Sequence, residues 1–190
     1  MSLFKKASSS DDKTIKISNT SNGQLVRTLT DNEEVFQTII SMKNSMLAGS
    51  TKVGLIKIYN INTGQLIRSI FEKNITQIYA LSLIKDDYLA SASENCIKIW
   101  NINNGALAQT LQGHSDSVYC LSENNGILAS GSEDKTIKLW NISNGTLIKT
   151  LTGHSKHVAC LAYLKDGSLV SVSHDKTIKI WPDLMSSKLY

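Results

Sequence analysis

The chain has 190 residues, of which 41% are hydrophobic and 19% charged, a composition typical of a folded globular protein. Its formal charge of +4 is spread along the sequence, so it does not predict a nucleic-acid-binding surface. No apolar run reaches the roughly 18 residues of a membrane-spanning helix, and the first residues lack the apolar core of a signal peptide. We therefore expect neither nucleic acid nor a membrane as a partner.

The three cysteines are Cys96, Cys120 and Cys160. An odd number without a CxxC pair favours free thiols over a disulfide framework or a zinc site. Since free cysteine behaves as a small apolar residue, we expect all three to be buried. This pattern predicts a reducing compartment, the cytoplasm, with the nucleus as the alternative location.

One phrase of alternating apolar residues and lysine, ending in I-K-[IL]-x, occurs five times. Its copies end at intervals of 40 or 41 residues, at Ser18, Tyr59, Trp100, Trp140 and Trp181. Alternation with a period of two predicts a β-strand. The central lysine recurs in every copy, which indicates a part of the architecture and not a phosphate site; the five are Lys16, Lys57, Lys98, Lys138 and Lys179.

Each repeat contains three further strand signals, and we label the four in chain order a, b, c and d, with the lysine phrase as c. A turn with glycine, such as Asn144-Gly145, separates c from d. Strand a opens each new unit, over residues 36–40, 78–83, 118–122 and 158–163, and strand b carries small residues. Four short strands per repeat with no helical pattern predict an all-β fold.

The sequence begins within a strand b, and residues 183–190 contain neither a glycine turn nor a d-like phrase. The predicted content is therefore b-c-d, three sets of a-b-c-d, and a-b-c. We treat residues 1–190 as a single repeat domain of about 4.6 units, with 183–190 as a tail.

The segment from Gly113-His114 to Trp140, and its copy ending at Trp181, resemble the WD-repeat family. The resemblance implies a β-propeller of four-stranded blades, a fold that has about 4 to 8 blades. Because the two ends overlap in b and c, they do not complete one blade together. We expect an incomplete propeller, either part of a larger one or an arc closed by a second chain; a smaller closed ring is the alternative.

In this family a histidine, a strand b hydroxyl, an aspartate and a tryptophan form a buried hydrogen-bonded network. The resemblance implies two such tetrads here: His114, Ser130 (or Ser132), Asp134 and Trp140, then His154, Ser171 (or Ser173), Asp175 and Trp181. A Ser-His-Asp set also suggests a hydrolase. Its recurrence in each unit and its ending on a tryptophan favour a structural role, so no catalytic residue is predicted.

The earlier units depart from this pattern. The third has Lys73 at the histidine position but keeps Ser91, Asn95 and Trp100. The second has Asn32, Gly49 and Val53 at the histidine, serine and aspartate positions and keeps only Tyr59 as an aromatic anchor; the first has Ser18 in place of tryptophan. We therefore expect the two C-terminal units to be the most rigid.

The family resemblance implies partner contacts on one rim, at the residue before the b–c aspartate and at the entry to strand a. These candidates vary between units and are Gln77, Glu94, Asp116, Ser117, Glu133, Lys156, His157 and His174. We hypothesise a non-enzymatic scaffold that binds a protein or peptide, with self-association as a way to complete the propeller.

The alternative is a regulatory or targeting propeller within a longer protein, linked for example to a kinase or F-box segment. A propeller enzyme would need an acid–base or metal cluster, and none is found in the sequence. No cofactor is expected, and the pair His157 and His174 is too small a set for a zinc site.

Overall fold

The computed structural model describes residues 5–31, 34–71, 77–85 and 87–182, and these form eighteen strands and no helix. The first sheet is β1 (Lys5–Ser9), β2 (Thr14–Asn19) and β3 (Leu25–Thr30). The second is β4 (Phe36–Ser41), β5 (Met46–Thr51), β6 (Leu55–Asn60) and β7 (Leu66–Phe71). The third is β8 (Ile78–Lys85), β9 (Tyr88–Ser93), β10 (Cys96–Asn101) and β11 (Leu107–Gln112).

Two more sheets complete the set. The fourth is β12 (Val118–Asn124), β13 (Ile127–Ser132), β14 (Ile137–Asn141) and β15 (Leu147–Leu151). The fifth is β16 (Val158–Tyr163), β17 (Leu169–Ser173) and β18 (Ile178–Trp181). All pairings are antiparallel between neighbours in sequence, so the sheets have the strand content b-c-d, three times a-b-c-d, and a-b-c. The 183–190 tail lies outside the described residues.

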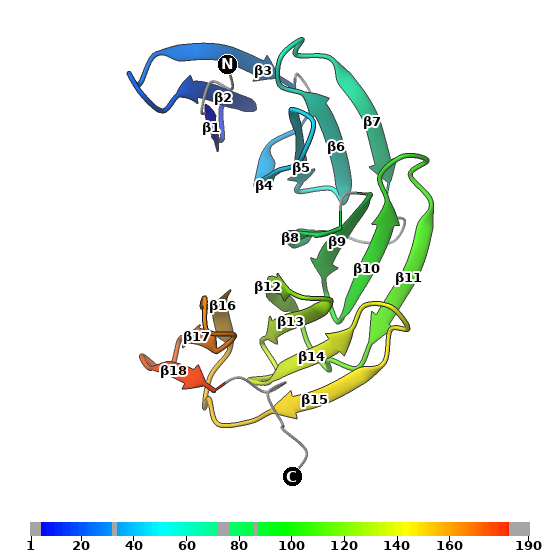
Figure 1. Cartoon of the computed structure of the whole chain (residues 1–190), viewed down its shortest axis with the longest axis vertical. Helices are drawn as coiled ribbons and strands as arrows, with labels where there is room; N and C mark the ends of the chain where they lie inside the picture. The colour runs from blue at the N-terminus through cyan, green and yellow to red at the C-terminus, as the bar shows by residue number, and fades with distance from the viewer. Residues whose placement is uncertain (1–4, 32–33, 72–76, 86, 183–190) are drawn as a thin grey trace.

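The five sheets are the blades of an open arc (Figure 1). Strands β4, β8, β12 and β16 lie along its inner side, and β3, β7, β11 and β15 along its outer side. The first and last blades do not meet. The predicted fold class, an all-β, partial propeller, is confirmed. Within the described residues, no helix has the length and apolar character needed to cross a membrane.

The c–d turns depend on glycine in the left-handed region. Four turn glycines have φ between 71° and 79°: Gly23, Gly64, Gly105 and Gly145. The N–H of each donates to the carbonyl oxygen of the asparagine four residues earlier at 2.8 Å. A side chain in that conformation would be strained, so glycine is the residue that closes these hairpins. The repeated Asn-Gly and Thr-Gly pairs thus set where each outer strand begins.

The hydrophobic core lies between blades and not within one. Strand β14 presents Ile137 and Leu139, each 1% exposed, to Val158 and Leu169 of the last blade. The approach is close, because a Cβ added to Gly131 would lie 2.7 Å from the Val158 side chain. The other three interfaces between neighbouring blades contain equivalent clusters. Each blade is therefore stabilised mainly by its neighbours.

In the last blade, the face equivalent to the one that β14 buries has no described blade packed against it. Ile178 and Ile180, the counterparts of Ile137 and Leu139, are 70% and 67% exposed. Val172, at the position of Gly131, is 40% exposed. Two adjacent isoleucines with this exposure form an apolar patch, which we call the end face (Val172, Ile178 and Ile180).

The prediction that all three cysteines are buried is wrong for Cys160, which is exposed, and Cys96 is half-buried. Only Cys120 is buried, with its Sγ 3.6 Å from the carbonyl oxygen of Val158 in the next blade. This burial raises the pKa of the Cys120 thiol to about 12. Cys160 occupies the same strand position in the last blade, where no described residue of a further blade covers it.

Candidate functional site

The structure brings His114, Ser130, Asp134 and Trp140 into one network in the fourth blade. His114 Nδ1 lies 2.7 Å from Asp134 Oδ2, and its Nε2 lies 2.7 Å from Ser130 Oγ. The Trp140 indole N–H donates to the same Oγ at 2.8 Å. One hydrogen arrangement satisfies every group: the indole donates to the serine, the serine to Nε2, and Nδ1–H to the carboxylate.

Two pKa values in this network are consistent with that arrangement. Burial lowers the pKa of His114 and outweighs the opposing effect of the Asp134 carboxylate, so the imidazole stays neutral. Burial alone would raise the pKa of Asp134, but hydrogen bonds from Thr136 and His114 lower it below its usual value. With a neutral histidine and an ionised aspartate, each hydrogen bond of the network has one donor proton and one acceptor.

The fifth blade contains a second network of the same form. His154 lies 2.7 Å from both Asp175 Oδ2 and Ser171 Oγ, and the Trp181 indole donates to that hydroxyl at 2.9 Å. The alternative serines, Ser132 and Ser173, have another task. Each donates to a backbone carbonyl, that of Asp116 or Lys156, and accepts from the backbone N–H of the tetrad aspartate.

The tetrad hydroxyls are not placed for nucleophilic catalysis, although Ser130–His114–Asp134 has the connectivity of a catalytic triad. Ser130 and Ser171 are each 0% exposed, so a substrate carbonyl has no access to either oxygen. Each hydroxyl also accepts a bond from an indole N–H. The arrangement therefore joins strands b and c to the loop entering strand a, a structural task.

The third and first units keep parts of this frame. In the third, the Trp100 indole donates to Ser91 Oγ at 2.9 Å, while Lys73, predicted at the histidine position, lies outside the described residues. In the first, Asp12 accepts from the Thr14 N–H and hydroxyl, as Asp134 does from Thr136. Ser18 occupies the tryptophan position and is partly exposed.

The second unit contains a different polar cluster, which the sequence reasoning missed. The buried Asp31 carboxylate forms an ion pair with Lys57 Nζ and accepts from the Tyr59 hydroxyl at 3.4 Å. The burial of the Tyr59 side chain, followed by the Asp31 charge, raises the pKa of Tyr59 to about 12. A serine at position 49 would require the Phe36 ring to move, since a Cβ there would lie 2.7 Å from that ring. The predicted substitute, Asn32, is outside the described residues.

The sequence holds one signal for this cluster. Asp31 stands where the fourth and fifth units have Gly113 and Gly153, one residue before the histidine position. Asp31 pairs with Lys57, the strand c lysine that recurs in every unit. In the fourth unit the equivalent lysine, Lys138, instead donates to Thr150 Oγ1 at 3.0 Å. The cluster thus combines an unusual acid with a residue common to all units.

All eight predicted partner-binding residues lie at one end of the blades, which we call the b–c rim. Glu94, Glu133 and His174 are exposed in the b–c turns. Gln77, Asp116, Ser117, Lys156 and His157 are in the segments entering strand a and are exposed or half-buried. Backbone hydrogen bonds join the two sets. The Glu133 N–H donates to the Ser117 carbonyl oxygen at 2.9 Å, and the His174 N–H donates to the His157 carbonyl oxygen at 3.1 Å.

The b–c rim also carries tyrosines that the sequence reasoning did not select. Tyr79 packs edge-on against Tyr119, with ring centroids 4.9 Å apart. Tyr119 lies 5.3 Å from the His157 ring, which lies 3.7 Å from the His174 ring. We call Tyr79, Tyr119, His157 and His174 the aromatic row. The sequence signal for the two tyrosines is the second residue of strand a, a position that varies between units.

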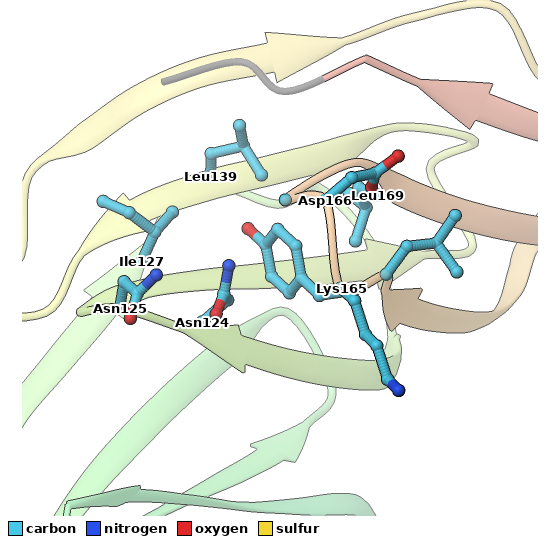
Figure 2. A pocket seen from close by; sticks show the side chains of 10 residues that line it. Asn124, Asn125, Ile127, Leu139, Lys165, Asp166 and Leu169 are labelled. Carbon is cyan, nitrogen blue, oxygen red and sulfur yellow. The ribbon is translucent and has the colours of Figure 1, made fainter. Parts of the chain in front are cut away.

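The opposite end, the a–b rim, has a pocket between the last two blades (Figure 2). Its volume is about 460 Å³, and it is lined by Ile127 and Leu139 of one blade and by Leu169, Lys165 and Asp166 of the next. A second pocket of about 390 Å³ lies between the third and fourth blades, lined by Ile84, Ile99 and Ile142 among others. Because both lie in gaps between neighbouring blades, they are features of the repeated frame. The part of the chain that the structure describes contains no group of three or more histidine, cysteine or acidic side chains placed to hold a metal.

Antiparallel blades fanned around an inner row of strands define a β-propeller chain. Residues 105–141 and 145–182 match the family model described as WD domain, G-beta repeat. The WD-repeat resemblance is thus confirmed over these two repeats.

Three solved structures share this fold. One is the computationally designed Ika8 protein, at 29% identity and a TM-score of 0.83 over 96% of this chain. The others, each at 23% identity over 95% of this chain, are the WD40 β-propeller domain of Doa1, with a TM-score of 0.84, and a chain of the mitotic checkpoint complex, with 0.86. The match covers 56% of the length of the Ika8 chain, 61% of the Doa1 chain and 58% of the checkpoint-complex chain. Comparison with curated proteins gives no match.

Proposed function

We propose that this protein is a non-catalytic scaffold whose b–c rim binds a protein or peptide in the cytoplasm. Propellers of this family generally act in protein interactions. The observation that supports the proposal is a contrast between two sets of residues. The tetrad histidines and serines are buried and repeat, whereas the neighbouring position in the b–c turn is exposed and changes from glutamate (Glu94, Glu133) to histidine (His174). Exposed residues that vary on a rigid frame are where recognition develops.

Photo-crosslinking tests this use of the rim. We expect a benzoylphenylalanine placed at Lys156 or Glu94, both exposed on the b–c rim, to form discrete protein adducts in cells. The matched control carries the same group at Ile148, which is 42% exposed on the outer strand β15. Adducts from position 148 alone, or equal adducts from all three positions, would contradict the proposal.

We also propose that the chain self-associates through the end face. Inside the arc the equivalent face buries Ile137 and Leu139 almost completely, so water exclusion favours a partner there. A fully buried isoleucine contributes roughly 1.5–3 kcal/mol relative to an exposed one. The face therefore offers a substantial driving force for contact with a second copy.

The mass of the particle in solution checks this expectation. We expect light scattering to find a dimer or larger species for the unmodified chain and a shift toward monomer for the double variant Ile178→Lys, Ile180→Lys. The control is Ile67→Lys, Ile148→Lys, which changes two isoleucines exposed on outer strands. A monomeric unmodified chain, or equal dissociation by the control, would rule out the end face as the interface.

A further inference from the structure

The aromatic row spans three blades on one surface. Tyr79 is on β8, Tyr119 on β12, and His157 and His174 belong to the last blade. Both tyrosines sit where the pairing of strand a with strand b shifts register, between Ile78 and Ala80 and between Val118 and Cys120. Such a bulge redirects the side chain of the extra residue. Ile78 and Val118 are completely buried, while the tyrosines beside them remain partly exposed.

Two carboxylates accompany the fourth-blade tyrosine. The Tyr119 hydroxyl donates to Glu133 Oε2 at 2.6 Å, which leaves Oε1 for another donor. This bond, then burial and the Glu133 charge, raise the pKa of Tyr119 to about 12, and the charge of Asp116 adds to the effect. Asp116 is exposed and is positioned by a 2.8 Å bond from the Ser117 N–H to its Oδ1. Negative charge is thus concentrated around one aromatic ring.

We infer that the aromatic row binds a protein segment through an arginine side chain, which stacks on Tyr119 and pairs with Glu133. A ring face attracts a cation, and a planar guanidinium can stack on a ring while it donates a hydrogen bond to a carboxylate oxygen. The inference rests on the proposed function, since it identifies the kind of partner that the same rim takes. Lys156 is exposed at the last-blade position that corresponds to Asp116, so the negative charge does not extend to the last blade.

A short peptide of known chemistry tests the inference by NMR. The probe is the capped pentapeptide Gly-Ala-Arg-Ala-Gly, titrated into the full chain labelled with ¹⁵N. The matched probe replaces arginine by citrulline, which has the same shape without the charge. We expect the arginine peptide to shift signals of Tyr79, Tyr119 and His157, with affinity at least about tenfold above that of the citrulline peptide.

Variants of the row and its surroundings separate recognition from folding. We expect Tyr119→Ala to weaken arginine-peptide binding about tenfold and Glu133→Gln several-fold, whereas Tyr119→Phe retains most of it. Lys165→Gln, an exposed change at the a–b rim, should leave it unchanged. Circular dichroism confirms that each variant is folded.

Equal affinity for the two peptides, shifts confined to the a–b rim, or full binding by Tyr119→Ala would overturn the inference. If crosslinking still captures proteins at the rim while the arginine peptide fails, the scaffold function survives and the arginine-specific contact does not. Loss of the rim crosslinks would remove both.

Discussion

Replacement of Asp31 by asparagine is expected to destabilise the protein more than the loss of any tetrad hydrogen bond. The Asp31 and Lys57 side chains are only 5% and 11% exposed, so the variant leaves a nearly buried ammonium without its counter-charge. Breaking a buried pair from one side typically costs about 3–5 kcal/mol of unfolding free energy. Urea denaturation followed by circular dichroism measures the loss.

The double variant Asp31→Asn, Lys57→Met tests whether the ion pair is the cause. Methionine removes the ammonium and keeps much of the side-chain volume, so much of the lost stability should return. The surface control is Asp11→Asn, because the Lys52–Asp11 pair is 56% and 90% exposed and contributes at most about 1 kcal/mol. Additive losses in the double variant would show that the two side chains act independently.

Substitution of Ser130 by alanine is expected to be the second largest loss. It removes the partner of the Trp140 indole N–H and of His114 Nε2, and Trp140 is 1% exposed. Each unsatisfied buried group costs about 1–3 kcal/mol, so we expect a loss of about 2–4 kcal/mol in unfolding free energy. The same urea titration gives the value.

Ser171→Ala is the matched comparison for this prediction. It breaks the equivalent bonds in the last blade, but Trp181 is partly exposed there, so water can replace the lost contact and the cost should be smaller. Neither variant should change ester hydrolysis, since both hydroxyls are buried. A hydrolytic rate abolished by Ser130→Ala would disprove the structural role.

The strand content and the blade order were predictable because their signals are local. Alternating residues define each strand, and the glycine of the c–d turn defines where the next one starts. The tetrads were predicted from the resemblance to the WD-repeat family, and their residues recur at fixed places in the fourth and fifth units. Gly145 and Trp140 are examples of residues whose role depends on a few neighbours in sequence.

The Asp31 cluster and the aromatic row were not predictable from the same pattern. Asp31 reaches Lys57 from a position that is glycine in other units, so alignment of the repeats pointed to Asn32 instead. Tyr79 and Tyr119 meet because of the spacing between neighbouring blades, which no single repeat contains. The exposure of Cys160 likewise depends on what covers the last blade.

The register shift in strand a recurs at Gln37, Tyr79, Tyr119 and Ala159, one position in each of four blades. The residue before it is buried in every case, as Phe36, Ile78, Val118 or Val158. Under the proposed binding function, mutation at the shifted position changes the surface presented to a partner and leaves the buried residue before it in place. In a scaffold of this design, new specificities would arise at these positions without a change in the buried core residues.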